Sequence, residues 1–465
     1  MTVPGLVVAA PASGSGKTTV ATGLIGALRA AGHAVAPFKV GPDFIDPGYH
    51  TLAAGRPGRN LDPVLVGERL IGPLYRHGSA AADIAVIEGV MGLFDGRIEN
   101  PAQASLAPAT PAVPPTGSTA HVAALLGAPV VLVVDARGQG QSLAALLHGF
   151  SSFDTKTRLA GVILNRVGTE RHEQVLRQAC DRAAIPVLGA IPRAAELSVP
   201  SRHLGLVTAV EHGRLARRAV HAMTDLIARH VDLAAITRVA TASVTEAPWD
   251  PKTAVGQHLT AGVTVALAAG KAFSFGYAEH VELLSAAGAE VAEFDPLTDP
   301  LPNNAAALVL PGGFPEQYVA DLSANDAVRQ QIRALADTGA PLHAECAGLT
   351  YLVSELDGHP MCGVLSGSAR FTERLALAYR DAVAVADSSL YAAGQRVVGH
   401  EFHRTAVTFT DSYQPAWVYP GGGHDIRDGA VHRNVHASYL HTHPAARPEA
   451  IDRFVAHAQP SKLAG

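Results

Sequence analysis

The chain of 465 residues is longer than one ordinary hydrophobic core requires, so we expect two domains of about 200 residues each. Hydrophobic residues make up 48% of the sequence and charged residues only 17%, a balance that excludes a disordered chain. The net charge is −5 and no block of Lys or Arg interrupts the sequence, so the composition gives no sign of a nucleic-acid or anionic-membrane surface.

Cysteine usage and hydropathy indicate where the protein works. The three cysteines, at positions 180, 346 and 362, are too scattered for a disulfide framework, and no CxxC pair suggests zinc. No apolar stretch reaches the roughly 20 residues that a membrane-spanning helix needs. The opening residues, "MTVPGLVVAA", lack the basic region of a targeting peptide. We therefore expect a soluble protein in the reducing cytoplasm.

The first half of the chain alternates apolar runs with helical patterns. Nearly continuous apolar runs are typical of parallel strands covered on both faces. The strands are predicted at residues 3–10, 33–41, 84–90, 129–136 and 159–167. A helix is expected at 18–31, ending before Gly32. This order predicts a doubly wound α/β domain over residues 1–240, with a mostly parallel sheet flanked by helices.

Two segments without apolar periodicity interrupt the pattern. Residues 101–119, rich in Pro and Ala, predict a mobile surface loop, and residues 241–261 predict the linker between domains. Strand and helix patterns then alternate again, which predicts a second α/β domain of the same kind over residues 262–465. Its strands are predicted at 263–270, 290–296, 305–313 and 341–346, and its helices at 277–288 and 327–339.

The stretch "PASGSGKTT", residues 11–19, follows the first predicted strand and has the residues of a phosphate-binding loop. Glycines let backbone N–H groups turn toward a phosphate, a lysine adds charge for the outer phosphates, and a threonine can bind Mg²⁺. The nucleotide-binding residues are predicted to be Gly14, Ser15, Gly16, Lys17, Thr18 and Thr19. Pro11 replaces the usual first glycine, which makes the loop similar to those of dethiobiotin synthetase and the partitioning ATPases. Ala12 stands where the partitioning switches carry an extra lysine, and this counts against a nucleotide-driven switch.

Two acidic segments follow later strands, at the edge where doubly wound sheets bind ligands. They are "KVGPDFIDPGYH" at residues 39–50 and "IEGVMGLFDG" at residues 87–96. A single carboxylate in such a place is more often a cap or a turn former. Several carboxylates at one edge, together with a phosphate loop, favour a magnesium site. We expect Thr18, Asp43 and Glu88 to bind Mg²⁺, and we assign Asp46, Tyr49 and Asp95 to an acceptor substrate.

A second candidate site lies in "PLHAECAGLTYL", residues 341–352. Cys346 follows an apolar strand and precedes a helix among small residues, which is the arrangement of a nucleophile elbow. The alternative is a small buried core cysteine. "VHASYLHTHP" near the C-terminus offers His436, His441 and His443 as bases. A Gly-Gly turn at Gly312 and Gly313 could supply an oxyanion hole.

Seven segments together resemble the cobyrinic or hydrogenobyrinic acid a,c-diamide synthases, the glutamine-dependent amidases of corrin biosynthesis. The resemblance runs over nearly the whole chain and combines a dethiobiotin synthetase-like domain with a class I glutamine amidotransferase-like domain. The segments are "KVGPDFIDPGYH", "EGVMGLFDG", "GSTAHVAALLGAPVVLVVDARGQGQS", "GGFPE", "AECAGLTYL", "GHEFH" and "ASYLHTH".

The resemblance implies a reaction and roles for particular residues. ATP would phosphorylate the c and then the a carboxylate of the macrocycle, and ammonia from glutamine would displace phosphate to leave an amide. Cys346 resembles the glutaminase nucleophile and His441 its base. His443 stands where many class I amidotransferases have an orienting Glu, so Glu401 or a water is considered for that role. Ala347, where relatives commonly have Gly, and "SFGYAEH", where an aromatic-rich segment is usual, are departures.

The expected partners are therefore ATP with Mg²⁺, L-glutamine and a corrin-type tetrapyrrole acid, and a homodimer is left open. Two alternatives remain at this level. The same architecture resembles the amidase that acts on nickel-sirohydrochlorin, so the acceptor could differ. The other alternative is a nucleotide-switch protein that binds partners. The Cys/His site argues against this alternative. No residue pattern distinguishes a cobalt-containing acceptor from a metal-free one.

Overall fold

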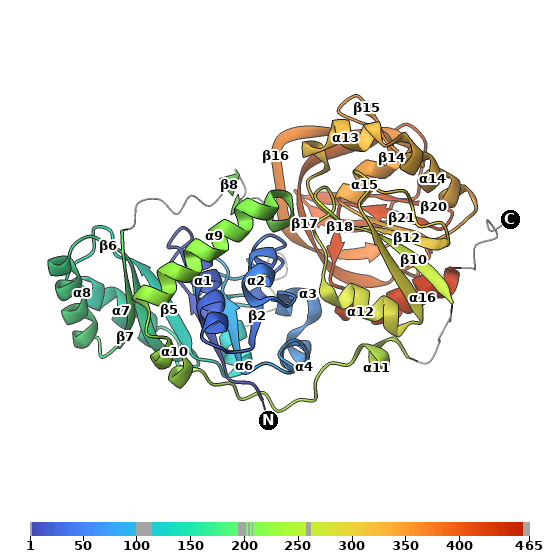
Figure 1. Ribbon diagram of the computed structural model, residues 1–465. Helices are drawn as coiled ribbons and strands as arrows, with labels where there is room; N and C mark the ends of the chain where they lie inside the picture. The colour runs from blue at the N-terminus through green and yellow to red at the C-terminus, as the bar shows by residue number, and fades with distance from the viewer. Residues whose placement is uncertain are drawn as a thin grey trace. The chain divides into compact units, whose positions relative to one another are not determined.

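The computed structural model describes residues 2–98, 114–193, 201–202, 205–206, 208–256 and 262–458. The chain forms two compact units, Met1–Trp249 and Asp250–Gly465 (Figure 1). In the loop expected at 101–119, residues 101–113 lie outside the described residues. In the linker expected at 241–261, residues 257–261 lie outside them. Within the described ranges, no helix is both long enough and apolar enough to cross a membrane.

The first unit is built on a seven-stranded parallel sheet in the order β3-β2-β4-β1-β5-β6-β7. Its strands are β1 (Gly5–Ala9), β2 (Val35–Val40), β3 (Arg59–Leu61), β4 (Ile84–Glu88), β5 (Val130–Asp135), β6 (Leu159–Val167) and β7 (Val187–Pro192). Five of them fall in the apolar runs predicted from sequence. Strands β3 and β7 were not predicted, and a two-stranded ribbon, β8 (Ser201–Arg202) with β9 (Gly205–Leu206), is separate from the sheet.

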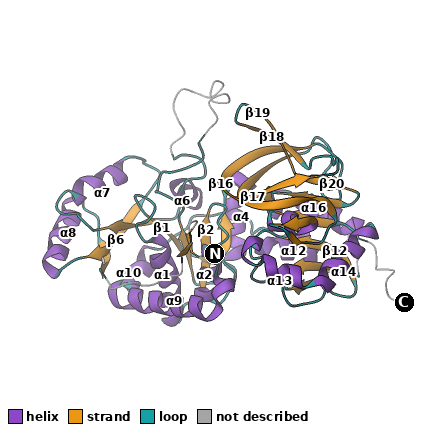
Figure 2. Ribbon diagram, turned by 90° about the horizontal axis from the view of Figure 1, so that it is seen from above, coloured by secondary structure: helices purple, strands orange, loops and turns teal. Residues whose placement is uncertain are grey.

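Helices cover both faces of this sheet. Figure 2 shows α1, α2 and α9 on one side of it and α6 on the other. The helices of this unit in the described ranges are α1 (Lys17–Ala30), α2 (Asp46–Ala54), α3 (Pro63–Val66), α4 (Glu68–Gly78), α6 (Thr119–Leu126), α7 (Leu143–Ser152), α8 (Glu170–Arg182), α9 (Ala209–His230) and α10 (Leu233–Val239). The doubly wound α/β fold predicted for the first domain is confirmed.

The second unit contains a six-stranded sheet in the order β11-β10-β12-β13-β21-β20, parallel except for its last pair. Its strands are β10 (Val263–Ala268), β11 (Ala289–Phe294), β12 (Ala305–Leu310), β13 (Leu342–Glu345), β20 (Ala430–His432) and β21 (Val435–Ser438). The described helices of this unit are α11 (Pro251–Val255), α12 (Ala278–Ala286), α13 (Val319–Ala324), α14 (Asp326–Asp337), α15 (Ala347–Leu352) and α16 (Pro448–His457), with 3-10 turns η1 (Pro315–Gln317) and η2 (Pro444–Ala446).

The second unit also contains a mostly antiparallel sheet of seven strands, which was not predicted from sequence. Its centre is the long pair β16 with β17, and β22 lies at one edge beside β17. The strands are β14 (Val353–Leu356), β15 (His359–Pro360), β16 (Leu365–Ala384), β17 (Arg396–Phe409), β18 (Trp417–Gly421), β19 (His424–Asp428) and β22 (His441–Thr442). This sheet brings the "GHEFH" and "HTH" segments side by side.

Helices α1 and α9 pack closely because α1 has glycines on the contact face. A Cβ added at Gly23 would lie 2.5 Å from the carbonyl oxygen of Met223, a backbone atom that cannot rotate away. Glycine in a helix interior normally costs about 0.5–1 kcal/mol relative to alanine. The close approach of α9 therefore requires glycine at position 23, despite this cost.

We expect Gly23→Ala to destabilise the protein by about 1–3 kcal/mol, the usual range for overpacking. The measurement is the midpoint of urea unfolding. Gly149→Ala on α7 is the matched control, because a Cβ there meets no atom within 4 Å and the helix should gain stability. Equal effects of the two substitutions would contradict this account of the α1–α9 contact.

Candidate active sites

The phosphate loop links β1 to α1, and two glycines give it its shape. Gly14 has φ 79° and Gly16 has φ 94°, left-handed values that glycine adopts readily. A Cβ on Gly16 would also collide with the side-chain amide of Asn165, which donates a hydrogen bond to the Ser15 carbonyl at 2.9 Å. Asn165 belongs to β6, which lies two strands away from β1 in the sheet, so a side chain of β6 stabilises the loop.

Lys17, the first residue of α1, is buried beside this loop. Its Nζ donates a hydrogen bond to the carbonyl oxygen of Met91 in the segment after β4. Burial, followed by the charge of Lys39, lowers the pKa of Lys17 from its ordinary value. The ammonium is therefore a compact positive charge in a poorly solvated place next to a helix N-terminus, where a phosphate would bind it strongly.

A buried cluster of charged side chains lies at the carboxyl edge of the same sheet. Lys39 Nζ at the end of β2 donates to Asp46 Oδ2 at 2.7 Å and to Glu88 Oε1 at 3.0 Å. Thr18 Oγ1 contacts the same two oxygens, at 3.3 Å and 2.7 Å. His50 Nε2 lies 2.7 Å from Glu88 Oε2. Four elements thus converge on one small volume.

The charges in this cluster influence one another. Burial alone would lower the pKa of Lys39, but the carboxylates of Asp46 and Glu88 raise it above its ordinary value. Burial would raise the pKa of Glu88, but Lys39 and His50 bring it well below its ordinary value. For Asp46, burial and the neighbouring Asp43 and Glu88 raise the pKa well above its ordinary value. Lys39 and Glu88 therefore form a buried ion pair, with Asp46 as a second carboxyl partner of the lysine.

The structure separates the roles expected for Asp43 and Asp46. Asp43 Oδ1 accepts hydrogen bonds from the backbone N–H groups of Ile45 and Asp46, at 2.7 Å and 3.0 Å, so it forms the turn that starts α2. Asp46, which was expected from sequence to bind the acceptor, lies beside Thr18. The oxygens grouped at the phosphate loop thus come from Thr18, Asp46 and Glu88.

The other predicted acceptor residues lie nearby in the chain but differ in surroundings. Tyr49 is fully buried on α2, and burial raises its pKa to about 12. Asp95 Oδ2 accepts a hydrogen bond from the N–H of Gly92 at 2.8 Å and closes a turn. Within the described ranges, no group of three His, Cys, Asp or Glu side chains could hold a metal ion. Magnesium commonly needs only one or two carboxylates when phosphates supply the other oxygens, so the grouped oxygens fit it.

The second site begins at a strained turn between β13 and α15. Cys346 has φ 50° and ψ −97°, values that a side chain bearing a Cβ rarely adopts. Its N–H donates to the Ser438 carbonyl at 2.7 Å, which holds the turn against β21. A Cβ on Gly348 would collide with the carbonyl of Leu310, so only glycine lets α15 approach β12 this closely. The predicted elbow geometry is present.

Backbone groups surround the Cys346 thiol. Burial, followed by the charge of Glu316, raises the pKa of this thiol above its ordinary value, while backbone hydrogen bonds from Ala347 and Gly313 act in the opposite direction. Cys346 Sγ also lies 3.7 Å from the carbonyl oxygen of Phe402 on β17, to which it donates. The N–H groups already aimed at sulfur are the donors that an oxyanion hole requires.

His441 reaches the same place from β22. It is fully buried and pairs across the antiparallel sheet with His400 on β17. A Cβ on Gly312 would collide with the His441 ring, whereas the carbonyl of Gly312 accepts a hydrogen bond from Phe275 at 3.0 Å. Gly312 therefore makes room for the imidazole, and Gly313 directs its N–H at the thiol. The Gly-Gly turn therefore faces both side chains, the His441 ring and the Cys346 thiol.

Other candidates for this site have different partners. His443 Nδ1 accepts from the N–H of Ala445 and caps η2, and its ring packs against Tyr277 with centroids 4.2 Å apart. His436 lies on β21 with Nδ1 3.2 Å from Ser388 Oγ. Glu401 binds Arg380 and accepts from the Tyr419 hydroxyl at 2.8 Å, so the geometry does not favour it as the carboxylate of His441.

A carboxylate that was not predicted from sequence does lie beside His441. Glu345, the last residue of β13, places Oε2 3.5 Å from His441 Nδ1. The signal that could have identified it is its position directly before Cys346, at the edge of a parallel sheet where ligands bind. The sequence places it far from the histidine, so the contact depends on the fold.

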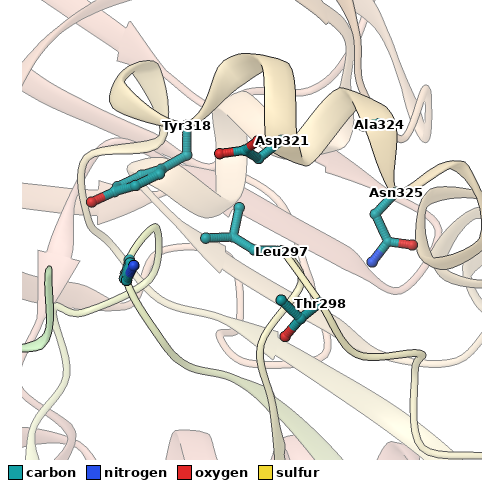
Figure 3. Close-up of a pocket in the computed structure, with 7 residues that line it drawn as sticks. Leu297, Thr298, Tyr318, Asp321, Ala324 and Asn325 are labelled. Atoms are coloured by element: carbon teal, nitrogen blue, oxygen red, sulfur yellow. The ribbon is translucent and has the colours of Figure 1, made fainter.

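A separate pocket of about 530 Å³ lies in the second unit, between the chain after β11 and the start of α13. Figure 3 shows Tyr318 and Asp321 on one side of it and Leu297 and Thr298 on the other. Neither Cys346 nor His441 lines this pocket, so it is not the centre of the Cys/His site.

Comparisons with known proteins agree with this division. Residues 6–207 match the model of the CobQ/CobB/MinD/ParA nucleotide binding domain, and residues 264–449 match that of the CobB/CobQ-like glutamine amidotransferase domain. The chain is 73% identical to hydrogenobyrinate a,c-diamide synthase of Mycobacterium tuberculosis, over 98% of each chain. It is 51% identical to the Streptomyces coelicolor protein of that name, over 99% of this chain and 98% of that one. Identity to cobyrinate a,c-diamide synthase of Synechococcus sp. is 38%, over 98% of each chain.

The contact between Gly312 and the His441 ring yields a test. We expect Gly312→Ala to displace the imidazole and to lower the rate of glutamine hydrolysis by about 100-fold or more, since a misplacement of about 1 Å can cost that much. The measurement is glutamate release from glutamine. Gly276→Ala is the matched control, because a Cβ there has no neighbour within 4 Å. A hydrolysis rate for Gly312→Ala equal to that of the control would show that the ring does not depend on this glycine.

Proposed function

The chain belongs to the hydrogenobyrinate and cobyrinate a,c-diamide synthases, and we propose that it divides their reaction between a phosphoryl-transfer site in the first unit and a glutaminase site in the second. It performs glutamine-dependent a,c-diamide synthesis on hydrogenobyrinic or cobyrinic acid in cobalamin biosynthesis. The family resemblance inferred from the sequence is confirmed. In the proposed division, each site carries its own step of this reaction.

In the first unit, the residues Gly14 to Thr19 hold the ATP phosphates through backbone N–H groups and the Lys17 ammonium. Thr18, Asp46 and Glu88 supply oxygens for Mg²⁺, which would neutralise phosphate charge during transfer. The distances from Thr18 Oγ1 to the two carboxylates, 3.3 Å and 2.7 Å, support this grouping. It replaces the set with Asp43 that the sequence suggested, because Asp43 serves the turn before α2.

Phosphorylation is needed because a carboxylate is a poor electrophile. An acceptor carboxylate oxygen attacks the terminal phosphorus of ATP, the bond to ADP breaks, and an acyl phosphate forms. Ammonia then attacks the acyl carbon, phosphate leaves with the carbon–oxygen bonding pair, and the amide remains. Lys17 stabilises the transferred phosphoryl group by its charge.

In the second unit, His441 takes the proton of the Cys346 thiol, and sulfur attacks the glutamine carboxamide. The N–H groups of Gly313 and Ala347 face the oxygen that becomes negative, and the imidazolium returns its proton to the departing ammonia. Water then cleaves the thioester to give glutamate. The observation that carries this proposal is the pair of backbone N–H groups directed at a sulfur in a strained elbow.

The relatives support one acceptor and one cellular place. The proteins at 73% and 51% identity are both named for hydrogenobyrinate, and the one named for cobyrinate stands at 38%, which supports the metal-free acid as the acceptor. Nickel-sirohydrochlorin and a switch function have no such support. Use of ATP and glutamine supports a cytoplasmic reaction.

We expect Lys17→Ala to abolish amide formation with glutamine and with free ammonia alike, because both routes need the phosphorylated acceptor. The measurement is mass spectrometry of hydrogenobyrinic acid, which loses about one mass unit for each carboxyl converted to an amide. Glutamine hydrolysis is followed as a control for folding of the second unit. Near-normal diamide synthesis by this variant would refute the nucleotide assignment.

We expect Cys346→Ala to stop ammonia release from glutamine and to keep amide synthesis from free ammonia at high concentration. The reason is that acceptor phosphorylation uses none of the groups around the thiol. His441→Ala should behave in the same way. A merely structural cysteine would instead weaken both nitrogen sources together through lost packing. Retained glutamine-driven turnover, or equal loss of both rates in a folded protein, would overturn the assignment.

A further inference from the structure

Glu345, at the end of β13, lies beside His441 and has no role in the mechanism proposed so far. Its Oε2 lies 3.5 Å from His441 Nδ1, and the two side chains are 13% and 0% exposed. The other Glu345 oxygen, Oε1, lies near a second imidazole, that of His343. A contact of 3.5 Å is long for a hydrogen bond, and catalytic contacts of this kind commonly tighten when substrate binds.

The other oxygen of Glu345 ties it to the strand that carries the histidine. Oε1 accepts hydrogen bonds from the N–H and the hydroxyl of Thr442, at 3.1 Å and 3.0 Å. Since Thr442 directly follows His441 in β22, the carboxylate is fixed relative to the imidazole through the backbone. His343 Nε2 also lies 3.4 Å from Oε1. The carboxylate is thus held on one side and directed at His441 on the other.

The charge of Glu345 suits an orienting role. Burial would raise its pKa, but the hydrogen bonds from His343 and His441 prevail and bring the pKa well below its ordinary value. The carboxyl is therefore ionised throughout the neutral range. An ionised carboxylate accepts hydrogen bonds and cannot donate them, so it selects the tautomer of a neutral imidazole that carries its proton on Nδ1.

We propose that Glu345 is the positioning residue of the glutaminase site, accepting a hydrogen bond from His441 Nδ1–H so that Nε2 is left to take the Cys346 proton. This rests on the roles proposed above for Cys346 and His441. The same carboxylate stabilises the imidazolium that forms when the thiol loses its proton. Glu345 touches neither the glutamine nor sulfur in this scheme and acts through the histidine.

The arrangement also accounts for the absence of an orienting Glu at position 443. His443 occupies the place expected for an orienting Glu, yet it caps η2 and packs against Tyr277. Glu401 is bound to Arg380 and Tyr419. The carboxylate comes instead from the residue next to the nucleophile, on a different strand and in a different sheet from the histidine. One strand end therefore supplies both the sulfur and the group that orients its base.

The test is Glu345→Gln, which keeps the side-chain volume and an oxygen for Thr442 but removes the charge. We expect the glutamine-driven kcat to fall by about 100-fold or more, as loss of the orienting carboxylate does in serine protease triads. The KM for glutamine and the ammonia-driven rate should stay within about threefold. Glu345→Asp restores the charge at a shorter reach, and we expect it to be at least tenfold faster than Glu345→Gln with glutamine.

Glu401→Gln is the matched control, because it neutralises another buried carboxylate of the same unit that is bound away from His441. Its glutamine-driven kcat should stay within about threefold. The proposal is overturned if Glu345→Gln retains its glutamine-driven kcat, if it loses the ammonia-driven rate equally, or if Glu401→Gln falls as far. If Glu345→Gln does not fold, Glu345→Asp carries the test, with an expected loss of about tenfold in the glutamine-driven rate alone.

The outcome for Cys346→Ala separates this inference from the proposed function. If that variant loses glutamine-driven turnover while Glu345→Gln keeps it, the glutaminase assignment stands and only the role of Glu345 fails. If Cys346→Ala retains glutamine-driven turnover, the site itself is wrong.

Discussion

Burial of ionised side chains at the ends of parallel strands is the constraint on which both sites depend. A charge removed from water is costly unless a partner and hydrogen bonds replace the solvent. In the first unit the ion pair with Lys39 offsets the cost of burying Glu88, and the pairing of β2 with β4 holds the two side chains together. In the second unit the contacts with the histidines and the hydrogen bonds from Thr442 offset the cost of burying Glu345. In each site the buried carboxylate thus has its polar partners in place before any substrate arrives.

The same crowding explains why small residues recur around the reactive groups. Gly16 at the phosphate loop, Gly312 at the histidine and Gly348 at the elbow each stand where a Cβ would collide with a neighbouring group. Close approach brings backbone N–H groups within reach of a phosphate or a sulfur, and no side-chain donor could be as rigid. The strained backbone of Cys346 is tolerated because β21 and α15 fix both sides of the turn.

Much of this arrangement could be predicted from the sequence, because continuous apolar runs and glycine-rich turns have local causes. The strands β1, β2, β4, β5 and β6, the phosphate loop and the elbow belong to this class. The contact of Asp46 with Thr18 and the turn formed by Asp43 could not be predicted, since either residue of one short segment could have formed the turn. The long strand β16 could not be predicted, because its mixture of buried and exposed positions gives no continuous apolar run. Glu345 was missed because its contact with His441 joins two sheets that are remote in sequence.

The chemical difference between the two units depends on which side chain partners the buried carboxylate. Lys39 is held protonated by Asp46 and Glu88, so it contributes a constant charge and can take no part in proton transfer at neutral pH. A neutral imidazole has a ring nitrogen that can accept a proton, so a carboxylate partnered by histidine keeps a proton acceptor within the cluster. Phosphoryl transfer needs fixed charge around the phosphates, whereas thiol attack needs a base that can gain and return a proton. The lysine pair and the histidine pair are accordingly not interchangeable, and each unit uses the partner that its reaction requires.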